Sequence, residues 1–205
     1  MIIKVCGMRV PENIRAIEQT GTNWMGFIFF PRSTRYVASR PAYLPEQCRR
    51  IGVFVNEKTE LILSKAKEFG LHGIQLHGKE TPEQCLILKS KGLEIVKTFS
   101  ISHPNNMKAI GDYEGICDYL LFDTACSGYG GSGQIFNWNI LQAYQGNTPF
   151  LLSGGICPAI LPDLLQFKHQ QWAGIDLNSG FEIAPGVKDD KAIHTFIKQF
   201  KQKIQ

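Results

Sequence analysis

The sequence lacks the features that mark a membrane protein or a nucleic-acid-binding protein. No apolar run approaches the roughly 18 to 20 residues that a membrane-spanning helix needs, and the opening MIIKVCGMR has no charged leader followed by a long apolar stretch. Lysines cluster only near the end of the chain, and no basic stripe is interleaved with aromatic residues. We therefore expect a cytoplasmic protein that binds neither membranes nor nucleic acid.

Metal-ligand spacing is also missing. The six cysteines include no CxxC pair, and no histidine stands at ligand spacing from any of them. The sequence therefore predicts no metal site, and we expect free thiols in a reducing compartment. Taken singly, each cysteine is first of all a small buried hydrophobe.

The composition is that of a folded chain with a mild positive charge. Of the 205 residues, 43% are hydrophobic and 20% are charged, which provides a core and excludes general disorder. The formal net charge of +4 suits a small anionic substrate. Because no linker, low-complexity stretch or charge block marks a boundary, we expect residues 1–205 to form one domain.

Short apolar segments rich in β-forming residues recur along the whole chain. They are near-continuous rather than alternating in polarity, which is typical of parallel strands covered on both faces. The expected strands are residues 2–6, 24–30, 51–55, 72–77, 93–99, 118–123, 149–153 and 173–177. Helical spacing predicts helices at 11–20, 57–69, 82–91, 138–144, 158–167 and 188–203. No clear helix follows the second strand, and the one after the fifth is weakly defined.

Eight βα units predict an α/β fold of the (β/α)8 type, a TIM barrel at the compact end of its size range. A doubly wound open sheet is the structural alternative, but no GxGxxG follows the first strand. In such barrels the chemistry lies at the C-terminal ends of the strands, where the βα loops converge. The strand ends are therefore the candidate site.

A thiol and a carboxylate stand at two of these strand ends. Cys6 ends the first expected strand and Asp123 ends the sixth, so closure of the barrel would let them face each other across its mouth. A thiolate serves as a base, and a carboxylic acid in a buried site donates a proton. The pair suits an isomerisation that moves protons. Taken alone, a residue such as Cys6 is more often part of the core, and Asp123 is alternatively an N-cap for the loop that follows it.

Three glycine-bearing loops follow the sixth, seventh and eighth expected strands. They are GYGGSG at 128–133, SGG at 153–155 and NSG at 178–180. Glycine lets backbone N–H groups converge on an anion, and a phosphate site near the last strands is frequent in these barrels. Taken singly, each of these loops is better explained as a tight turn, whereas three at one end of a barrel favour phosphate binding.

Three further polar residues follow strands. Arg35, in PRSTRY, is the cation best placed for a carboxylate or a phosphate because guanidinium binds such groups in a bidentate manner. The alternative is a solvated loop arginine. His77, in QLHG, either contacts substrate or satisfies a backbone carbonyl, and Asp176 either orients substrate hydroxyls or caps the next turn.

An ordered series of sequence blocks resembles the phosphoribosylanthranilate isomerase family of tryptophan biosynthesis. The blocks are KVCGM, GFIFFPRSTRYV, IGVFVN, IQLHGKE, LLFDT with GYGGSGQIFNW, LLSGGI and IDLNSGFEIAPGVKD. Single blocks are weak signals, but the series runs nearly end to end and keeps its order. The resemblance implies an eight-stranded barrel, a cofactor-free enzyme that is a monomer or homodimer, and a small anionic phosphosugar as substrate.

The resemblance also implies a reaction and residue roles. N-(5-phosphoribosyl)anthranilate would undergo an Amadori rearrangement to 1-(2-carboxyphenylamino)-1-deoxyribulose 5-phosphate. Asp123 would be the general acid that protonates the furanose ring oxygen, and Cys6 the general base that removes the proton from C2. Arg35 resembles the arginine near the anthranilate carboxylate, with His77 and Asp176 also expected at the substrate. The phosphate is expected on Gly131, Ser132, Gly154, Gly155, Ser179 and Gly180.

Two other functions remain as alternatives. A bifunctional phosphosugar isomerase that also serves histidine synthesis would use two carboxylates, whereas the first strand here ends in Cys6 and no internal half-repeat is apparent. A catalytically silent barrel that binds a phosphorylated ligand or a partner protein would need neither the Cys6 thiol nor the Asp123 carboxylate.

Overall fold

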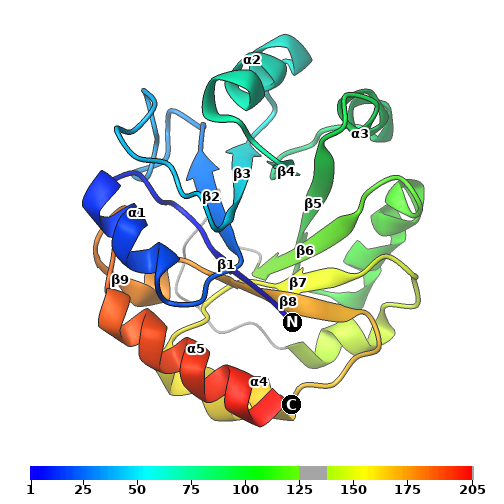
Figure 1. The fold of residues 1–205 in the computed structure, drawn as a ribbon. Coiled ribbons are helices and arrows are strands. Elements are labelled where there is room, and N and C mark those ends of the chain that lie inside the picture. The colour runs from blue at the N-terminus through cyan, green and yellow to red at the C-terminus, as the bar shows by residue number, and fades with distance from the viewer. Residues whose placement is uncertain (125–137, 205) are drawn as a thin grey trace.

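Eight parallel strands form a closed barrel in chain order, which confirms the predicted (β/α)8 fold (Figure 1). The computed structural model describes residues 1–124 and 138–204, so two expected phosphate positions, Gly131 and Ser132, lie outside the described residues. The strands are β1 (Ile2–Val5), β2 (Trp24–Ile28), β3 (Arg49–Phe54), β4 (Gly73–Leu76), β5 (Glu94–Ile101), β6 (Tyr119–Thr124), β7 (Phe150–Leu152) and β8 (Trp172–Leu177). The ring closes where β1 pairs with β8, with Ile2 opposite Gly174 and Val5 opposite Leu177.

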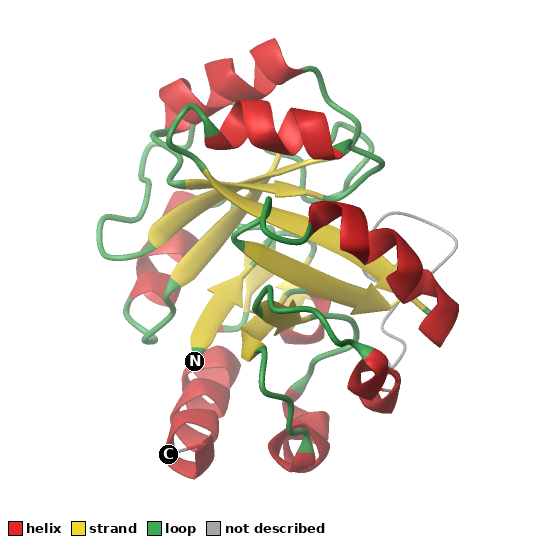
Figure 2. Ribbon diagram, turned by 90° about the vertical axis from the view of Figure 1, so that its right-hand side faces the viewer, coloured by secondary structure: helices red, strands yellow, loops and turns green. Residues whose placement is uncertain are grey.

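Helices surround the strands on the outside of the barrel (Figures 1 and 2). The α-helices are α1 (Pro11–Glu18), α2 (Thr59–Phe69), α3 (Pro82–Lys89), α4 (Leu161–Gln166) and α5 (Asp190–Ile204). Short 3₁₀ helices are η1 (Pro104–Tyr113), η2 (Trp138–Ala143), η3 (Pro158–Ile160) and η4 (Ser179–Phe181). Within the described residues, no helix combines the length and the apolar character needed to cross a membrane.

The helix ends follow local chemistry. Thr81 accepts a hydrogen bond from the backbone N–H of Gln84 at the start of α3. Gly70 ends α2 in the left-handed conformation, with φ of 57°. In the predicted helix 158–167, Pro162 supplies no N–H donor, and the segment divides into η3 and α4. The predicted helix 138–144 is the 3₁₀ helix η2.

A small antiparallel hairpin follows β8, and the sequence reasoning did not predict it. It consists of β9 (Glu182–Ala184) and β10 (Val187–Lys188), so α5 begins at Asp190 rather than at Lys188 as expected. The side chain of Asn13 in α1 binds both backbone groups of Lys188, each at 2.8 Å. These bonds fix the hairpin beside α1, where Figure 1 shows β9.

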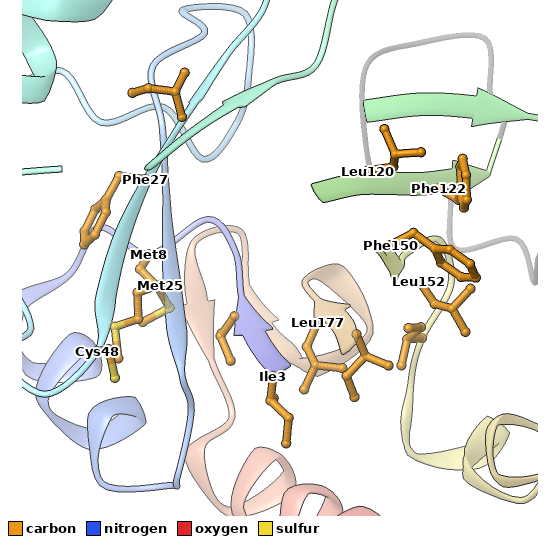
Figure 3. Packing of buried hydrophobic residues seen from close by; sticks show 14 of the residues in the cluster. Ile3, Met8, Met25, Phe27, Cys48, Leu120, Phe122, Phe150, Leu152 and Leu177 are labelled. Atoms are coloured by element: carbon orange, nitrogen blue, oxygen red, sulfur yellow. The ribbon is translucent and has the colours of Figure 1, made fainter. Parts of the chain in front are cut away.

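The core has two parts because successive side chains of a strand point to opposite faces. One part lies between the strands and the helices; it includes Phe122 and Phe150, whose rings are 4.9 Å apart (Figure 3). The other part fills the barrel near the starts of the strands. Its buried members are Trp24, Ile51, Val96, Leu121 and Leu151. Full burial of one such side chain contributes about 1.5–3 kcal/mol, and this cluster holds the strands in register beneath the polar mouth.

Candidate active site

The interior of the barrel changes from apolar to polar along the strands. A residue two positions after an interior residue also faces the interior. Asp123 follows Leu121 in this way, and Lys4 and Cys6 follow Ile2, which packs against the interior cluster. The backbone N–H of Cys6 continues the strand ladder by donating to the carbonyl of Leu177 at 2.9 Å. The structure therefore brings the predicted thiol and carboxylate to the same mouth of the barrel.

Cys6 is 3% exposed and lies against Gly26 of β2. A Cβ atom placed on Gly26 would lie 2.7 Å from Cys6 Sγ and 3.2 Å from Lys4 Nζ. Only glycine leaves room here for both side chains. Burial raises the pKa of the Cys6 thiol, and the positive charge of Lys4 acts in the opposite direction by favouring the thiolate.

Lys4 forms a buried ion pair with Asp176 across the closure between β1 and β8. Nζ of Lys4 donates to Oδ1 of Asp176 at 2.8 Å, and the two side chains are 0% and 6% exposed. Burial alone lowers the pKa of Lys4, but the charges of Asp176 and Cys6 outweigh it, so the pKa is raised. Asp176 thus keeps the Lys4 side chain positively charged beside Cys6. The expected contact of Asp176 with substrate stays a prediction.

His77 lies next to Asp123. The distance from His77 Nε2 to Asp123 Oδ2 is 3.6 Å, and His77 Nδ1 lies 3.0 Å from the side-chain nitrogen of Gln75. Burial, with the positive charges of Lys4 and Lys97, lowers the pKa of His77 to about 4. The ring is therefore neutral near pH 7. When Nδ1 accepts from Gln75, Nε2 carries the proton and faces the carboxyl group of Asp123.

Arg35 is held by Glu182, the first residue of the hairpin. Its Nε donates to Oε1 of Glu182 at 2.8 Å and its Nη2 to Oε2 at 2.5 Å. The Arg35 side chain passes over Gly7, where a Cβ atom would lie 2.7 Å from Arg35 Cδ. Arg35 is therefore a fixed, half-buried cation beside the loop that contains Cys6 and Gly7, rather than a solvated loop arginine.

Lys188 shares the same carboxylate. Its Nζ donates to Glu182 Oε1 at 2.6 Å and to Asn178 Oδ1 at 2.7 Å. Burial would raise the pKa of Glu182, but hydrogen bonds from Arg35 and Lys188 lower it to about 2. Sequence reasoning missed Glu182 and Lys188. The only local signal is the turn dipeptide Pro185–Gly186 between them.

The loops after β7 and β8 touch each other at this mouth. Gly154 and Gly155 have positive φ values of 84° and 69°. A Cβ atom on Gly180 would overlap the carbonyl oxygen of Ile156, so the two loops pack without a side chain between them. Four of the six expected phosphate positions thus lie in two adjoining loops: Gly154, Gly155, Ser179 and Gly180. Phosphate binding there stays a prediction.

The arrangement is suited to moving protons on an anionic molecule. It offers a thiol beside an ammonium group, a carboxyl group beside a neutral imidazole, and a fixed guanidinium at the rim. Across residues 1–124 and 138–204, no group of three or more His, Cys, Asp or Glu side chains could hold a metal ion.

Comparison with known proteins gives a consistent result over the whole chain. Residues 3–199 match the family model described as N-(5'phosphoribosyl)anthranilate (PRA) isomerase. The chain is 73% identical to the N-(5'-phosphoribosyl)anthranilate isomerase of Phocaeicola vulgatus, covering 100% of both proteins. It is 49% identical to that of Parabacteroides distasonis, over 97% of this chain and 93% of the relative.

Solved structures agree with the sequence matches. The phosphoribosyl anthranilate isomerase of Thermotoga maritima superposes with a TM-score of 0.84 at 31% identity, over 98% of this chain and 100% of that one. A phosphoribosyl anthranilate isomerase in complex with reduced 1-(o-carboxyphenylamino)-1-deoxyribulose 5-phosphate superposes with a TM-score of 0.81 at 29% identity, with the same coverage.

Proposed function

The chain belongs to the N-(5'-phosphoribosyl)anthranilate isomerase family and is an isomerase of tryptophan biosynthesis, and from this premise we propose the reaction and the residues that carry it. The substrate is N-(5'-phosphoribosyl)anthranilate, and the product is 1-(2-carboxyphenylamino)-1-deoxyribulose 5-phosphate. A solved relative binds the reduced form of that product, which supports a ligand with the same carboxylate and phosphate here. The observation that carries the proposal is the presence of Cys6 and Asp123 at one mouth of the barrel.

In the first step Asp123 acts as the general acid. It gives its proton to the furanose ring oxygen, the bond from C1 to that oxygen breaks, and the anthranilate nitrogen supplies its lone pair to form an iminium at C1. His77 stays neutral because its pKa is lowered to about 4, so it lies 3.6 Å from Asp123 without taking up the proton. The positive iminium then acidifies the C2–H bond.

In the second step Cys6 acts as the general base. The thiolate removes the C2 proton, the C–H electrons form a C1–C2 double bond, and the iminium electrons return to nitrogen. The resulting enolamine loses its hydroxyl proton at C2 and gains one at C1, which yields the ketone. The Lys4 ammonium group supports the thiolate in a site where burial disfavours it. General acid or base help contributes roughly 10² to 10⁴ in rate for each group.

The anionic ends of the substrate are held apart from these two groups. Arg35 binds the anthranilate carboxylate, and the loops that carry Gly154 and Gly180 bind the phosphate, together with positions outside the described residues. His77 and Asp176 complete the substrate site. The reaction needs no cofactor and takes place in the cytoplasm, where a thiol base stays reduced. The protein works as a monomer or homodimer; one solved relative is a dimeric isomerase from which monomers were generated.

Loss of anthranilate fluorescence in the presence of EDTA tests the reaction and the absence of a metal requirement together. Cys6→Ser and Asp123→Asn should each lower kcat by about 10² to 10⁴ while the protein stays folded. Matched controls are Cys48→Ser and Asp118→Asn, since Cys48 and Asp118 precede β3 and β6 at the opposite end of the barrel. Wild-type turnover in Cys6→Ser or Asp123→Asn would contradict the mechanism.

A further inference from the structure

The hairpin after β8 places one carboxylate between two cations at the rim of the site. The side chain of Glu182 is 7% exposed and binds both Arg35 and Lys188. We propose that Glu182 is a positioning residue that orients the Arg35 guanidinium and thereby sets the affinity of the enzyme for the carboxylate of its substrate. This inference rests on the proposed function, because it gives Glu182 a role in the carboxylate binding assigned to Arg35.

The hydrogen-bond geometry defines which edge of Arg35 is used. A guanidinium has five N–H donors in a planar fork. Glu182 takes Nε and one N–H of Nη2, so three donors on the two terminal nitrogens face away from the hairpin. A second carboxylate can bind in a bidentate manner only at that terminal edge. Glu182 therefore determines which edge of the guanidinium remains for substrate.

The local charge balance favours an added anion. Asp176 compensates Lys4 in the ion pair inside the barrel. Glu182, Arg35 and Lys188 form a cluster at the rim of the site, in which one negative charge meets two positive charges. While Cys6 is a neutral thiol, one positive charge in this cluster is left for a carboxylate from outside; the Cys6 thiolate, once formed, acts on the same two cations. Glu182 thus orients Arg35 without cancelling the attraction of the rim for an anion.

Glu182 is itself held in place, as a positioning residue must be. Oε1 also accepts from the backbone N–H of Gly186 at 3.0 Å in the hairpin turn. Lys188, its other partner, is fixed through its backbone to Asn13 and through its side chain to Asn178. The guanidinium is therefore oriented before substrate arrives, and the conformational cost of binding is reduced.

The test measures binding of two phosphorylated ligands by calorimetry. One is reduced 1-(o-carboxyphenylamino)-1-deoxyribulose 5-phosphate, and the other is the same compound without its carboxylate. Glu182→Gln should weaken binding of the first by about 10- to 100-fold and change the second by less than about 2-fold, because misorientation affects only the ligand that uses Arg35. KM should rise more than kcat falls. The exposed Glu60→Gln is the matched control and should leave both affinities unchanged.

A double-mutant cycle separates positioning from a merely structural role. In an Arg35→Ala background, Glu182→Gln should cause no further loss of affinity for the carboxylate ligand. Equal weakening of both ligands, or additive losses in the cycle, would overturn the inference. If Glu182→Gln does not fold, Glu182→Asp, which keeps the charge but retracts it, should show the same selective loss, and unchanged affinities in it would also overturn the inference.

The same measurements distinguish the two proposals. If Arg35→Ala binds both ligands as well as the wild type does, the assignment of Arg35 to the substrate carboxylate fails, and the role of Glu182 fails with it. If Arg35→Ala loses affinity only for the carboxylate ligand while Glu182→Gln loses none, the proposed function stands and the positioning role alone is wrong.

Discussion

A single added methyl group at Gly26 should disable the enzyme without removing any functional group. The Cβ of Gly26→Ala would lie 2.7 Å from Cys6 Sγ and 3.1 Å from Cys6 Cα. Favourable non-bonded contacts need about 3.5–4.0 Å, so the atoms must separate by about 1 Å. The sulfur is the atom that moves, because the backbone at Cα yields less easily. A displacement of that size can cost about 10²-fold in rate. Overpacking should also lower the free energy of unfolding by about 1–3 kcal/mol.

The assay combines steady-state kinetics with urea unfolding. Gly111→Ala in η1 is the matched control because nothing lies within 4 Å of its new Cβ, and it should keep wild-type kcat and stability. In a Cys6→Ser background, Gly26→Ala should reduce kcat little further, since its effect passes through the sulfur. A Gly26→Ala enzyme with wild-type kcat would refute the reasoning that the position of Cys6 Sγ limits the reaction.

Two further changes probe the buried charges. The pKa of His77 is lowered from 6.5 to about 4, so the unfolded chain binds more protons below pH 6.5. The free energy of unfolding should therefore fall by about 2 kcal/mol between pH 7 and pH 5 through this group. Urea unfolding at both pH values should show that His77→Gln lacks this part of the pH dependence. Lys4→Met should destabilise the fold by about 3–5 kcal/mol by leaving Asp176 charged and unpaired, whereas adding Asp176→Leu should restore most of it; a double variant no more stable than Lys4→Met would contradict this.

Much of the fold was predictable from the sequence because each strand carries a local signal. The apolar segment around Leu120 to Phe122 is a near-continuous run, and all eight such segments became barrel strands in order. The hairpin was not predictable in this way. Its tether, Asn13, lies 175 residues from Lys188 along the chain, and no local pattern reports such a contact.

The candidate site likewise has a part that could be predicted from the sequence and a part that could not. Cys6 and Asp123 stand at predicted strand ends, so their placement at one mouth followed from the barrel fold alone. The pairing of Asp176 with Lys4 did not follow from the fold class, because it depends on the register between β1 and β8. The partner of Arg35 likewise depends on the hairpin, whose residues come 147 positions later. Side-chain pairs made by distant segments were therefore the part that sequence reasoning could not supply.

The seam between β1 and β8 has a consequence for how this protein becomes active. The thiol directly follows β1, the first barrel strand to be synthesised, and the ion pair beside it is completed only by β8, the last strand of the barrel. Such distant contacts form late, since the chain must first close its longest loop. A polypeptide that lacks β8 has no Asp176 to pair with Lys4, so we expect activity only after the barrel closes.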